Sequence, residues 1–545
     1  MKNVSLRCVV SWLGFAALAP LAAQDRNVSG GPLRSDQACY DVQHYTLRIE
    51  VDPAKKAIAG VLTMQASLLA PAATIGLDLD SALTVSAVTV DGKAAAFERP
   101  PGRILVRPEP ALAAGSAFAV EVTYGGVPRE AKRPPWDGGF TWSQTKDGQP
   151  WIATSCQGEG ADLWWPCKDH PSDKPAGFDL YVTVPKGLVV AGNGVRQGEP
   201  VGKGKQATSH WQVRSPIANY NIALNIAPYV ELRDTFTCID GTKMPIQFFV
   251  LPDSAKRAKA CMPQFLDHLR CFEELLGPYP FRHEKYGIAE TPHLGMEHQT
   301  MIAYGNGFGD EQYDWLHNHE LAHEWWGNLV TCRDWKDMWI HEGFGTYMQP
   351  LYRERRFGQK AYDDEIRKYR LMNRTPIAPR EIKNSAEIYF SASGNDIYYK
   401  GSYVLHTLRW QLGDAKFFTA LRRFCYPTKA AEQATDGSQC RFVDTDDFVA
   451  LVNEIAGEDL GWFFEVYVRQ PSLPRLEQEV KDGVLQLRWR TADDLPFALP
   501  VPVVLGGETQ RVEMKGGAGS LRVGDREFQV DPTMRLLMQR PRSGR

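Results

Sequence analysis

The stretch His319-Glu320-Leu321-Ala322-His323 decides how this chain of 545 residues is interpreted. It is an HExxH motif in a segment, residues 314–328, whose apolar spacing predicts a helix. Residues four apart on a helix project from the same face, so both imidazoles can reach one metal ion. Glu320 can then face a water molecule bound to that ion. Because zinc in catalytic sites takes three protein ligands, the motif predicts a zinc site that needs a third ligand.

The residues after the motif indicate that the site is buried. The alternative is an exposed helix that carries two ordinary histidines. Burying unpaired His and Glu side chains would be costly, so an apolar environment favours a metal-bound pair. The apolar residues that follow the motif are Trp325, Trp326, Leu329 and Val330.

Glu342 is a candidate for the third ligand. It lies in the sequence WIHEGF at 339–344, inside a second predicted helix, residues 339–356. A carboxylate in such an aromatic-rich helix must pair with something, and two His with one Glu is an established zinc set. His341 is the competing ligand, and the residues alone leave both open.

The rest of the chain divides into parts of different character, which predicts an α+β multidomain protein. Residues 39–230 alternate apolar with polar side chains, as in HYTLRIEV at 44–51 and NYNIALNI at 219–226, and predict an antiparallel β domain. Residues 231–472 predict an α-rich domain with a small sheet, and residues 473–545 a small β domain. The predicted helices of the middle domain span 254–276, 314–328, 339–356, 362–372, 402–412 and 445–455, with Ser254 and Thr445 as N-caps.

The first residues predict export. Lys2 and Arg7 precede an apolar run, residues 8–21, and the small pair Ala22 and Ala23 suits a cleavage site, so residues 1–23 are expected to form a signal peptide. An uncleaved anchor or a buried N-terminal helix is the alternative. Residues 24–38 are rich in Gly, Ser and Asn and predict a flexible leader. Because no second apolar stretch is long enough to span a bilayer, we expect a periplasmic or secreted protein without stable membrane insertion.

Charge and cysteine content narrow the partners and the crosslinks. A net charge of -3 and a pI near 6.5 provide no broad basic field, so nucleic acid is not an expected partner. Loss of Cys8 with the signal peptide would leave an odd number of the ten cysteines. Cys425 and Cys440 bracket a polar stretch and are the expected disulfide pair.

Several segments, in order along the chain, resemble the gluzincin aminopeptidases of peptidase family M1, the group that includes aminopeptidase N and leukotriene hydrolase. The segments are HYTLRIEVDP at 44–53, WWPCKDHPSDK at 164–174, GMEHQTM at 295–301, HELAHEWWGN at 319–328, WIHEGFGTY at 339–347 and RQPSLPRLE at 469–477. The resemblance implies a saddle-like N-terminal β domain, a thermolysin-like catalytic domain and a small C-terminal β domain. It also implies one zinc ion per chain, with Glu342 rather than His341 as the third ligand.

The resemblance further implies which residues hold the substrate. Glu297 matches the glutamate of the GxMEN motif, which grips the free α-amino group, and Gly295 and Met296 precede it. Gln157 matches a position that also contacts the amine, and the nearby Glu159 is a candidate to share this role. Tyr398 matches the tyrosine of the YxKG pattern, whose hydroxyl stabilises the oxyanion.

Three departures from the family pattern affect these expectations. His298 replaces the usual Asn, which bears on how the adjoining peptide backbone is held, and Gln349 replaces a frequent Glu near the metal. The sequence also stops where many members continue into a large helical domain, which implies a more open cleft.

The expected activity is hydrolysis of the N-terminal peptide bond of peptides with free N-termini, with Glu320 as general base. A zinc endopeptidase, an epoxide or lipid hydrolase, and a catalytically dead binding protein are the alternatives. The sequence leaves the preferred N-terminal residue, the physiological substrate and the oligomeric state open.

Overall fold

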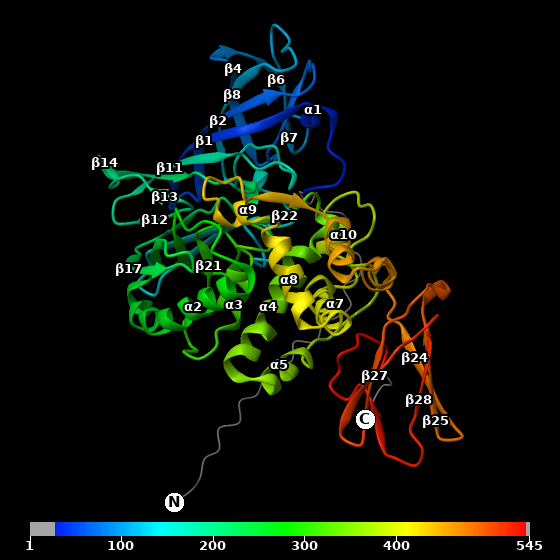
Figure 1. Cartoon of the computed structure of the whole chain (residues 1–545). Helices are drawn as coiled ribbons and strands as arrows, with labels where there is room; N and C mark the ends of the chain where they lie inside the picture. The colour runs from blue at the N-terminus through cyan, green and yellow to red at the C-terminus, as the bar shows by residue number, and fades with distance from the viewer. Residues whose placement is uncertain (1–27, 541–545) are drawn as a thin grey trace, which may run out of the picture.

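The computed structural model describes residues 28–540, which fold into three parts (Figure 1). An N-terminal β part, blue to cyan, lies at one end, and an α-rich part, green to yellow, follows it. A small β part, orange to red, lies beside the helices. The predicted α+β multidomain class is confirmed.

A nine-stranded sheet forms most of the N-terminal part, in the order β13-β15-β11-β1-β2-β8-β4-β5, with β14 also paired to β15. The alternation read from the sequence places Tyr45 and Leu47 in the core, with no exposed surface. Only β1 and β11 pair in parallel, from His44 opposite Gly177 onward. The strands are β1 Tyr40–Asp52, β2 Ala57–Leu68, β4 Leu83–Val90, β5 Lys93–Ala94, β8 Ala117–Gly126, β11 Gly177–Pro185, β13 Val195–Arg196, β14 Val201–Lys203 and β15 Gln206–Val213.

Two smaller sheets complete this part, and one of them carries a site residue. The four-stranded sheet β12-β16-β10-β9 ends its strand β10 at Ser155, two residues before Gln157. The expected strand 219–226 is wrong at its start, because Asn219–Asn221 forms a 3-10 turn, η2. The other bounds are β9 Gly139–Gln144, β10 Pro150–Ser155, β12 Val189–Ala191 and β16 Asn225–Ala227, and, in a three-stranded sheet, β3 Ile75–Asp78, β6 Ala96–Glu98 and β7 Arg103–Arg107.

The middle part contains a five-stranded sheet in the order β17-β18-β19-β21-β20. Its last strand, β20, holds only Gly295 and Met296, and so presents Glu297 directly after the sheet edge. The bounds are β17 Val230–Thr237, β18 Lys243–Val250, β19 Tyr286–Glu290, β20 Gly295–Met296 and β21 Ile302–Tyr304, and a separate pair is β22 Val330–Cys332 with β23 Arg441–Val443.

The helices cover this sheet, and the predicted ones are present with shifted ends. The helix of the HExxH motif stops earlier than expected, at Ala322, with His323 as its helical C-cap. The cap predicted at Thr445 is instead Asp444, which forms a capping box with Asp447. The bounds are α2 Ala255–Leu276, α3 Trp315–Ala322, α4 Trp339–Phe357, α5 Gln359–Ile366, α6 Ala386–Tyr389, α7 Asp396–Leu412, α8 Asp414–Cys425, α9 Lys429–Gln433, α10 Thr445–Ala456 and α11 Gly461–Phe464.

Close contact between α4 and α7 explains the glycine that follows Tyr398 and Lys400. A Cβ on Gly401 would lie 2.8 Å from the Cα of Gly343, which is too close for any side chain. The two glycines therefore let the helix that carries Tyr398 pack directly on the helix that carries Glu342. Lys400 anchors the same helix, because its Nζ donates hydrogen bonds to the carbonyls of Gln470 and Pro471 at 2.8 and 3.1 Å.

Two three-stranded antiparallel sheets form the C-terminal part, as Figure 1 shows in orange and red. Leu485, Leu487 and Trp489 point inward from one of them. The bounds are β24 Arg475–Lys481, β25 Val484–Arg490, β26 Val501–Leu505, β27 Glu508–Val512, β28 Ala518–Arg522 and β29 Phe528–Val530.

The flexible leader expected at 24–38 is wrong for residues 28–38, which pack against the other parts. The amide of Ser29 donates to the Oγ of Ser385 at 3.2 Å, and the amide of Gly31 donates to Asp334 at 2.8 Å. A Cβ on Gly31 would lie 2.0 Å from the carbonyl oxygen of Lys383. The glycines of this segment therefore permit a close backbone approach rather than flexibility.

The signal peptide predicted at 1–23 lies outside the described residues. Within residues 28–540, every helix is too short or too polar to cross a bilayer.

The expected disulfide between Cys425 and Cys440 is wrong, because both residues are free thiols, as are all cysteines of the described part. Cys425 is buried at the end of α8. The residues next to the two cysteines are in contact, since the guanidinium of Arg441 donates to the carbonyl of Phe424 and lies 5.2 Å from the Phe424 ring. That part of the chain is thus tied to α8 without a crosslink.

Candidate metal and catalytic site

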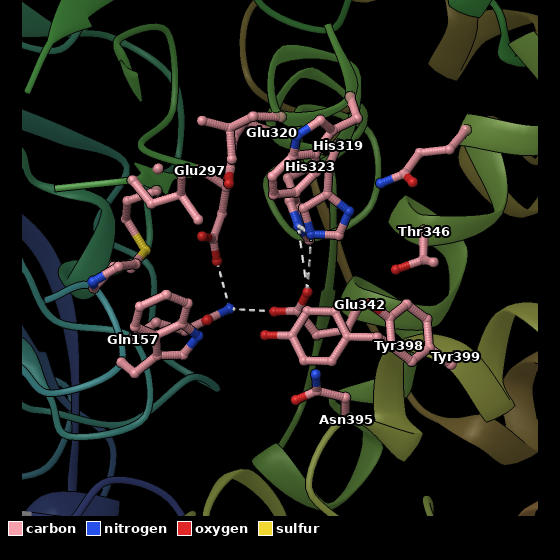
Figure 2. A pocket seen from close by; sticks show the side chains of 18 of the residues that line it. Gln157, Glu297, His319, Glu320, His323, Glu342, Thr346, Asn395, Tyr398 and Tyr399 are labelled. Carbon is pink, nitrogen blue, oxygen red and sulfur yellow. Dashed lines mark hydrogen bonds and ion pairs between the residues drawn. The ribbon is translucent and has the colours of Figure 1, made fainter. Parts of the chain in front are cut away.

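One cavity of ≈ 230 Å³ collects the residues that the sequence singled out. It lies between the N-terminal β part, the edge strand β20 and the helices α3, α4 and α7, and Figure 2 shows the labelled side chains converging on it. All nine predicted site residues line this cavity: Gln157, Gly295, Met296, Glu297, His319, Glu320, His323, Glu342 and Tyr398.

His319, His323 and Glu342 form a group that fits a metal ion. The Nε2 atoms of the two histidines are 3.2 Å apart, and the Oε2 of Glu342 lies 3.4 and 3.5 Å from them. Ligand atoms at the corners of a tetrahedron around zinc lie roughly 3.3–3.6 Å apart, given the usual bond lengths. The spacing of the three atoms therefore matches three corners of a zinc site.

Hydrogen bonding and charge support the same fit. The Nδ1 of His323 lies 2.9 Å from the carbonyl of Trp326 and donates a hydrogen bond to it. The lone pair of Nε2 is then available for a metal ion. Oε2 of Glu342 is buried without a hydrogen-bond partner in the described part of the chain. Burial raises the pKa of Glu342, but His323 and His319 lower it by more than burial raises it. The net effect is a lowered pKa, so the carboxylate stays ionised. A buried, ionised and unsatisfied oxygen beside two imidazoles is a natural metal ligand.

His341, the competing ligand, lies outside this group. Its Nε2 accepts a hydrogen bond from the backbone amide of Cys332 at 3.0 Å, so the ring anchors β22. The side chain points away from the cavity because it precedes Glu342 by one position on α4, about 100° around the helix.

Glu320 faces the same cavity, with 6% of its surface exposed. Burial, followed by repulsion from Glu297, raises its pKa well above the usual value. Gly295 leaves room for it, since a Cβ at that position would lie 2.6 Å from Oε1 of Glu320. The glycine of β20 thus sets where the Glu320 carboxylate lies.

A Gly295→Ala substitution is expected to lower kcat/KM about tenfold or more, because displacing a catalytic group by 1 Å can cost up to about 10²-fold. Gly309→Ala is the matched control, because nothing lies within 4 Å of a Cβ there. Steady-state kinetics of both variants check the expectation. Equal activity of the two variants would show that Gly295 does not control the position of Glu320.

Glu297 lies next to the metal-ligand group and is held by neutral donors. The Nε2 of Gln157 donates to Oε1 of Glu297 at 2.5 Å and to Oε1 of Glu342 at 2.8 Å, as the dashed lines in Figure 2 show. The hydroxyl of Tyr220 donates to Glu297 at 3.0 Å. Tyr220 was missed by sequence reasoning, because it lies in the turn η2 that the alternating pattern presented as a strand.

Tyr398 reaches the metal-ligand group from α7, and its ring centroid lies 5.9 Å from that of His319. Tyr389, from α6, lines the same cavity and was not predicted. Tyr399 also lines the cavity, but its ring stacks on Tyr369 with centroids 5.0 Å apart. The position of Tyr398 relative to Glu342 thus depends on the close contact between Gly401 of α7 and Gly343 of α4.

The departures from the family pattern occupy different environments. His298 is 1% exposed and does not line the cavity, so it turns away from the space for a substrate. Gln349 does line it, together with Thr346 of the same helix. Glu159, the candidate to share the role of Gln157, accepts a hydrogen bond from the backbone amide of Gly138 at 2.6 Å and braces the loop before β9.

Comparison with known proteins adds independent support for this arrangement. The Peptidase M1 N-terminal domain profile matches residues 41–220, and the Peptidase family M1 domain profile matches residues 294–467, together more than half of the chain. The chain belongs to peptidase family M1. The M1 resemblance inferred from the motifs is therefore confirmed. The candidate metal site of this M1 protein, His319, His323 and Glu342, has the HExxH-and-Glu form.

Individual relatives are distant. Aminopeptidase M1 of Arabidopsis thaliana is 25% identical over 415 residues, covering 70% of this M1 chain and 45% of the relative. Leukotriene A-4 hydrolase of Xenopus laevis is 26% identical over 380 residues, covering 64% and 56%. This M1 chain spans about half the length of the curated relatives it matches.

Solved structures share the fold. An M1 zinc metallopeptidase from Deinococcus radiodurans superposes with a TM-score of 0.64 at 25% identity, covering 81% of this chain and 96% of that one. A mutant of that protein, bound to a Tyr-Ser-Ala substrate, gives a TM-score of 0.66 at 24% identity, covering 82% and 98%.

Proposed function

We propose that this M1 protein is a zinc-dependent aminopeptidase that removes the N-terminal residue of peptides. The observation that carries the proposal is the position of Glu297. Its carboxylate oxygen belongs to a second group of ligand atoms, with Glu320 and His323, that lie within 4.8 Å of one another. A buried carboxylate this close to the metal-ligand group suits the ammonium group at the N-terminus of a peptide. Substrates that lack a free ammonium group lose that pairing.

Three buried carboxylates in one cavity call for positive charge. Glu297, Glu320 and Glu342 all lie within it, and burial and mutual repulsion raise the pKa of the first two. His319, His323 and Glu342 would hold the zinc ion, and the ammonium of the substrate would offset Glu297. When bound, zinc would polarise the scissile carbonyl and lower the pKa of a water molecule towards about 7.

The chain's own residues supply the proton transfers and orientation. Glu320 is free to accept a proton from the attacking water, and it then returns the proton to the leaving amine. Its raised pKa suits a group that must hold the proton between these steps. The hydroxyl of Tyr398 donates a hydrogen bond to the developing oxyanion. Glu297 and Gln157 hold the N-terminus, so that only the first peptide bond reaches Glu320.

A Glu297→Gln variant tests this proposal. We expect kcat/KM for peptides with a free N-terminus to fall by about 10–10² fold, because a neutral amide replaces the charge-assisted contact. Kinetics on free and N-acetylated versions of one aminoacyl amide, with metal content measured in parallel, check it. Unchanged preference for the free amine, with zinc retained, would show that Glu297 is not the anchor.

Export of the protein remains a proposal that rests on the sequence of residues 1–23. A mass measurement of the mature N-terminus from the native host would test it.

A further inference from the structure

The amine end of the cavity is walled by apolar side chains. Leu294 and Met296 flank Gly295 directly before Glu297, and Pro135 and Trp136 come from the loop between β8 and β9. Tyr389 completes this wall. With the amine held at Glu297 and the first carbonyl at the metal-ligand group, we expect the side chain of the first residue to face this wall.

The loop of Trp136 is tied to the segment that carries Gln157. The backbone amide of Gly138, two residues after Trp136, donates to Oε2 of Glu159, two residues after Gln157, at 2.6 Å. The Oγ of Ser155 also approaches the carbonyl of Asp137 at 3.5 Å. Trp136 is therefore held at a fixed place relative to Gln157.

Tyr389 is fastened to the same segment from the other side. A Cβ on Gly158 would lie 3.2 Å from the Tyr389 ring, so the ring packs on the backbone next to Gln157. The Oγ of Ser385, at the start of α6, donates to the carbonyl of Gly158. The Gln157 segment thus carries both the amide at the amine site and the supports of two aromatic walls.

Trp136 is also exposed, which is unusual for so large an apolar side chain. It is 53% exposed, although Pro135 beside it is buried. Exposed aromatic surface at the edge of a cavity gains free energy when an apolar group covers it. Trp315, 45% exposed on the first turn of α3, lines the same cavity from the catalytic part.

We propose that Trp136 selects substrates whose first residue has a large apolar side chain, such as Leu or Phe, by packing on that side chain. The proposal rests on the proposed aminopeptidase function and names its substrate class. The N-terminal β part, through the loop of Trp136, then sets the preference of a reaction whose catalytic groups lie on the helices.

The test compares Trp136→Ala with Trp315→Ala, a control in which the second exposed tryptophan of the cavity, on α3, is removed instead. We expect the wild type to prefer Leu over Gly aminomethylcoumarin substrates in kcat/KM. Trp136→Ala should lower this ratio about tenfold or more, while Trp315→Ala changes it less than about twofold, because lost apolar contact for a side chain is worth such factors. Trp136→Phe should keep most of the ratio, and thermal melts show whether each variant is folded.

Either of two kinetic results would overturn the proposal: no Leu preference in the wild type, or a ratio that Trp136→Ala lowers no more than Trp315→Ala does. A binding measurement separates it from the proposed function. Calorimetry of Leu-Gly-Gly and Gly-Gly-Gly on the zinc-loaded Glu320→Gln variant, with and without Trp136→Ala, reads the preference without turnover. Tighter binding of Leu-Gly-Gly to this variant, together with a wild-type protein that cleaves no peptide, would refute the aminopeptidase and keep the side-chain site. Equal binding of the two peptides would refute the side-chain site.

Discussion

Glu320→Gln is expected to lower kcat by about 10²–10⁴ fold and to leave the zinc content of the protein unchanged. The amide has the shape of the carboxylate but cannot accept a proton, and general-base catalysis is typically worth such a factor. Glu320 is not one of the three residues His319, His323 and Glu342 whose ligand atoms lie 3.2–3.5 Å apart. Its loss should therefore affect proton transfer and spare metal binding.

Metal analysis and steady-state kinetics on the same preparation check this result. Glu342→Gln is the informative comparison, because it should lose zinc together with activity. If Glu320→Gln retained wild-type turnover, the assignment of the general base would be wrong. If it lost its zinc, Glu320 would be part of the metal site rather than beside it.

Tyr398→Phe is expected to lower kcat by about 10²–10³ fold with little change in KM. One hydrogen-bond donor to an oxyanion is worth about that much, and the donor acts only as the transition state forms. Phenylalanine keeps the ring that lies 5.9 Å from His319, so the packing of α7 should be preserved.

Tyr399→Phe is the matched control for this change. Tyr399 lines the same cavity from the same helix, yet its ring stacks on Tyr369. Its variant should keep kcat within about threefold, since it loses no transition-state contact. A larger loss in Tyr399→Phe than in Tyr398→Phe would move the oxyanion role to the neighbouring residue.

Local patterns predicted much of the molecule because they are set by backbone geometry. The period of two in residues 44–51 placed β1 with its apolar side inward, and the four-residue spacing of His319 and His323 brought their Nε2 atoms together. The same helical rule would have brought Trp315, four residues before His319, to the cavity. Trp315 lies outside the HExxH motif, so the motif alone does not point to it.

Contacts between distant segments could not be read from the sequence. Tyr220 reaches Glu297 across 77 residues, and the Gly343–Gly401 contact depends on how two helices cross. Gly30 and Gly31 suggested flexibility, yet the space around them allows only glycine. Cys425 and Cys440 suggested a disulfide from their spacing alone. That prediction was wrong because the spacing of two cysteines carries no information about where their side chains point.

The measurement that tests the central claim most directly is hydrolysis of one aminoacyl fluorogenic amide in its free and N-acetylated forms by the purified, metal-analysed protein. We predict about one zinc per chain and cleavage of the free-amine form alone, with activity lost on chelation and restored by zinc. Cleavage of the acetylated form at a comparable rate would contradict the aminopeptidase and the anchoring role of Glu297, and would favour an endopeptidase. Bound zinc without cleavage of any free-amine substrate in a broad panel would contradict the peptidase function itself.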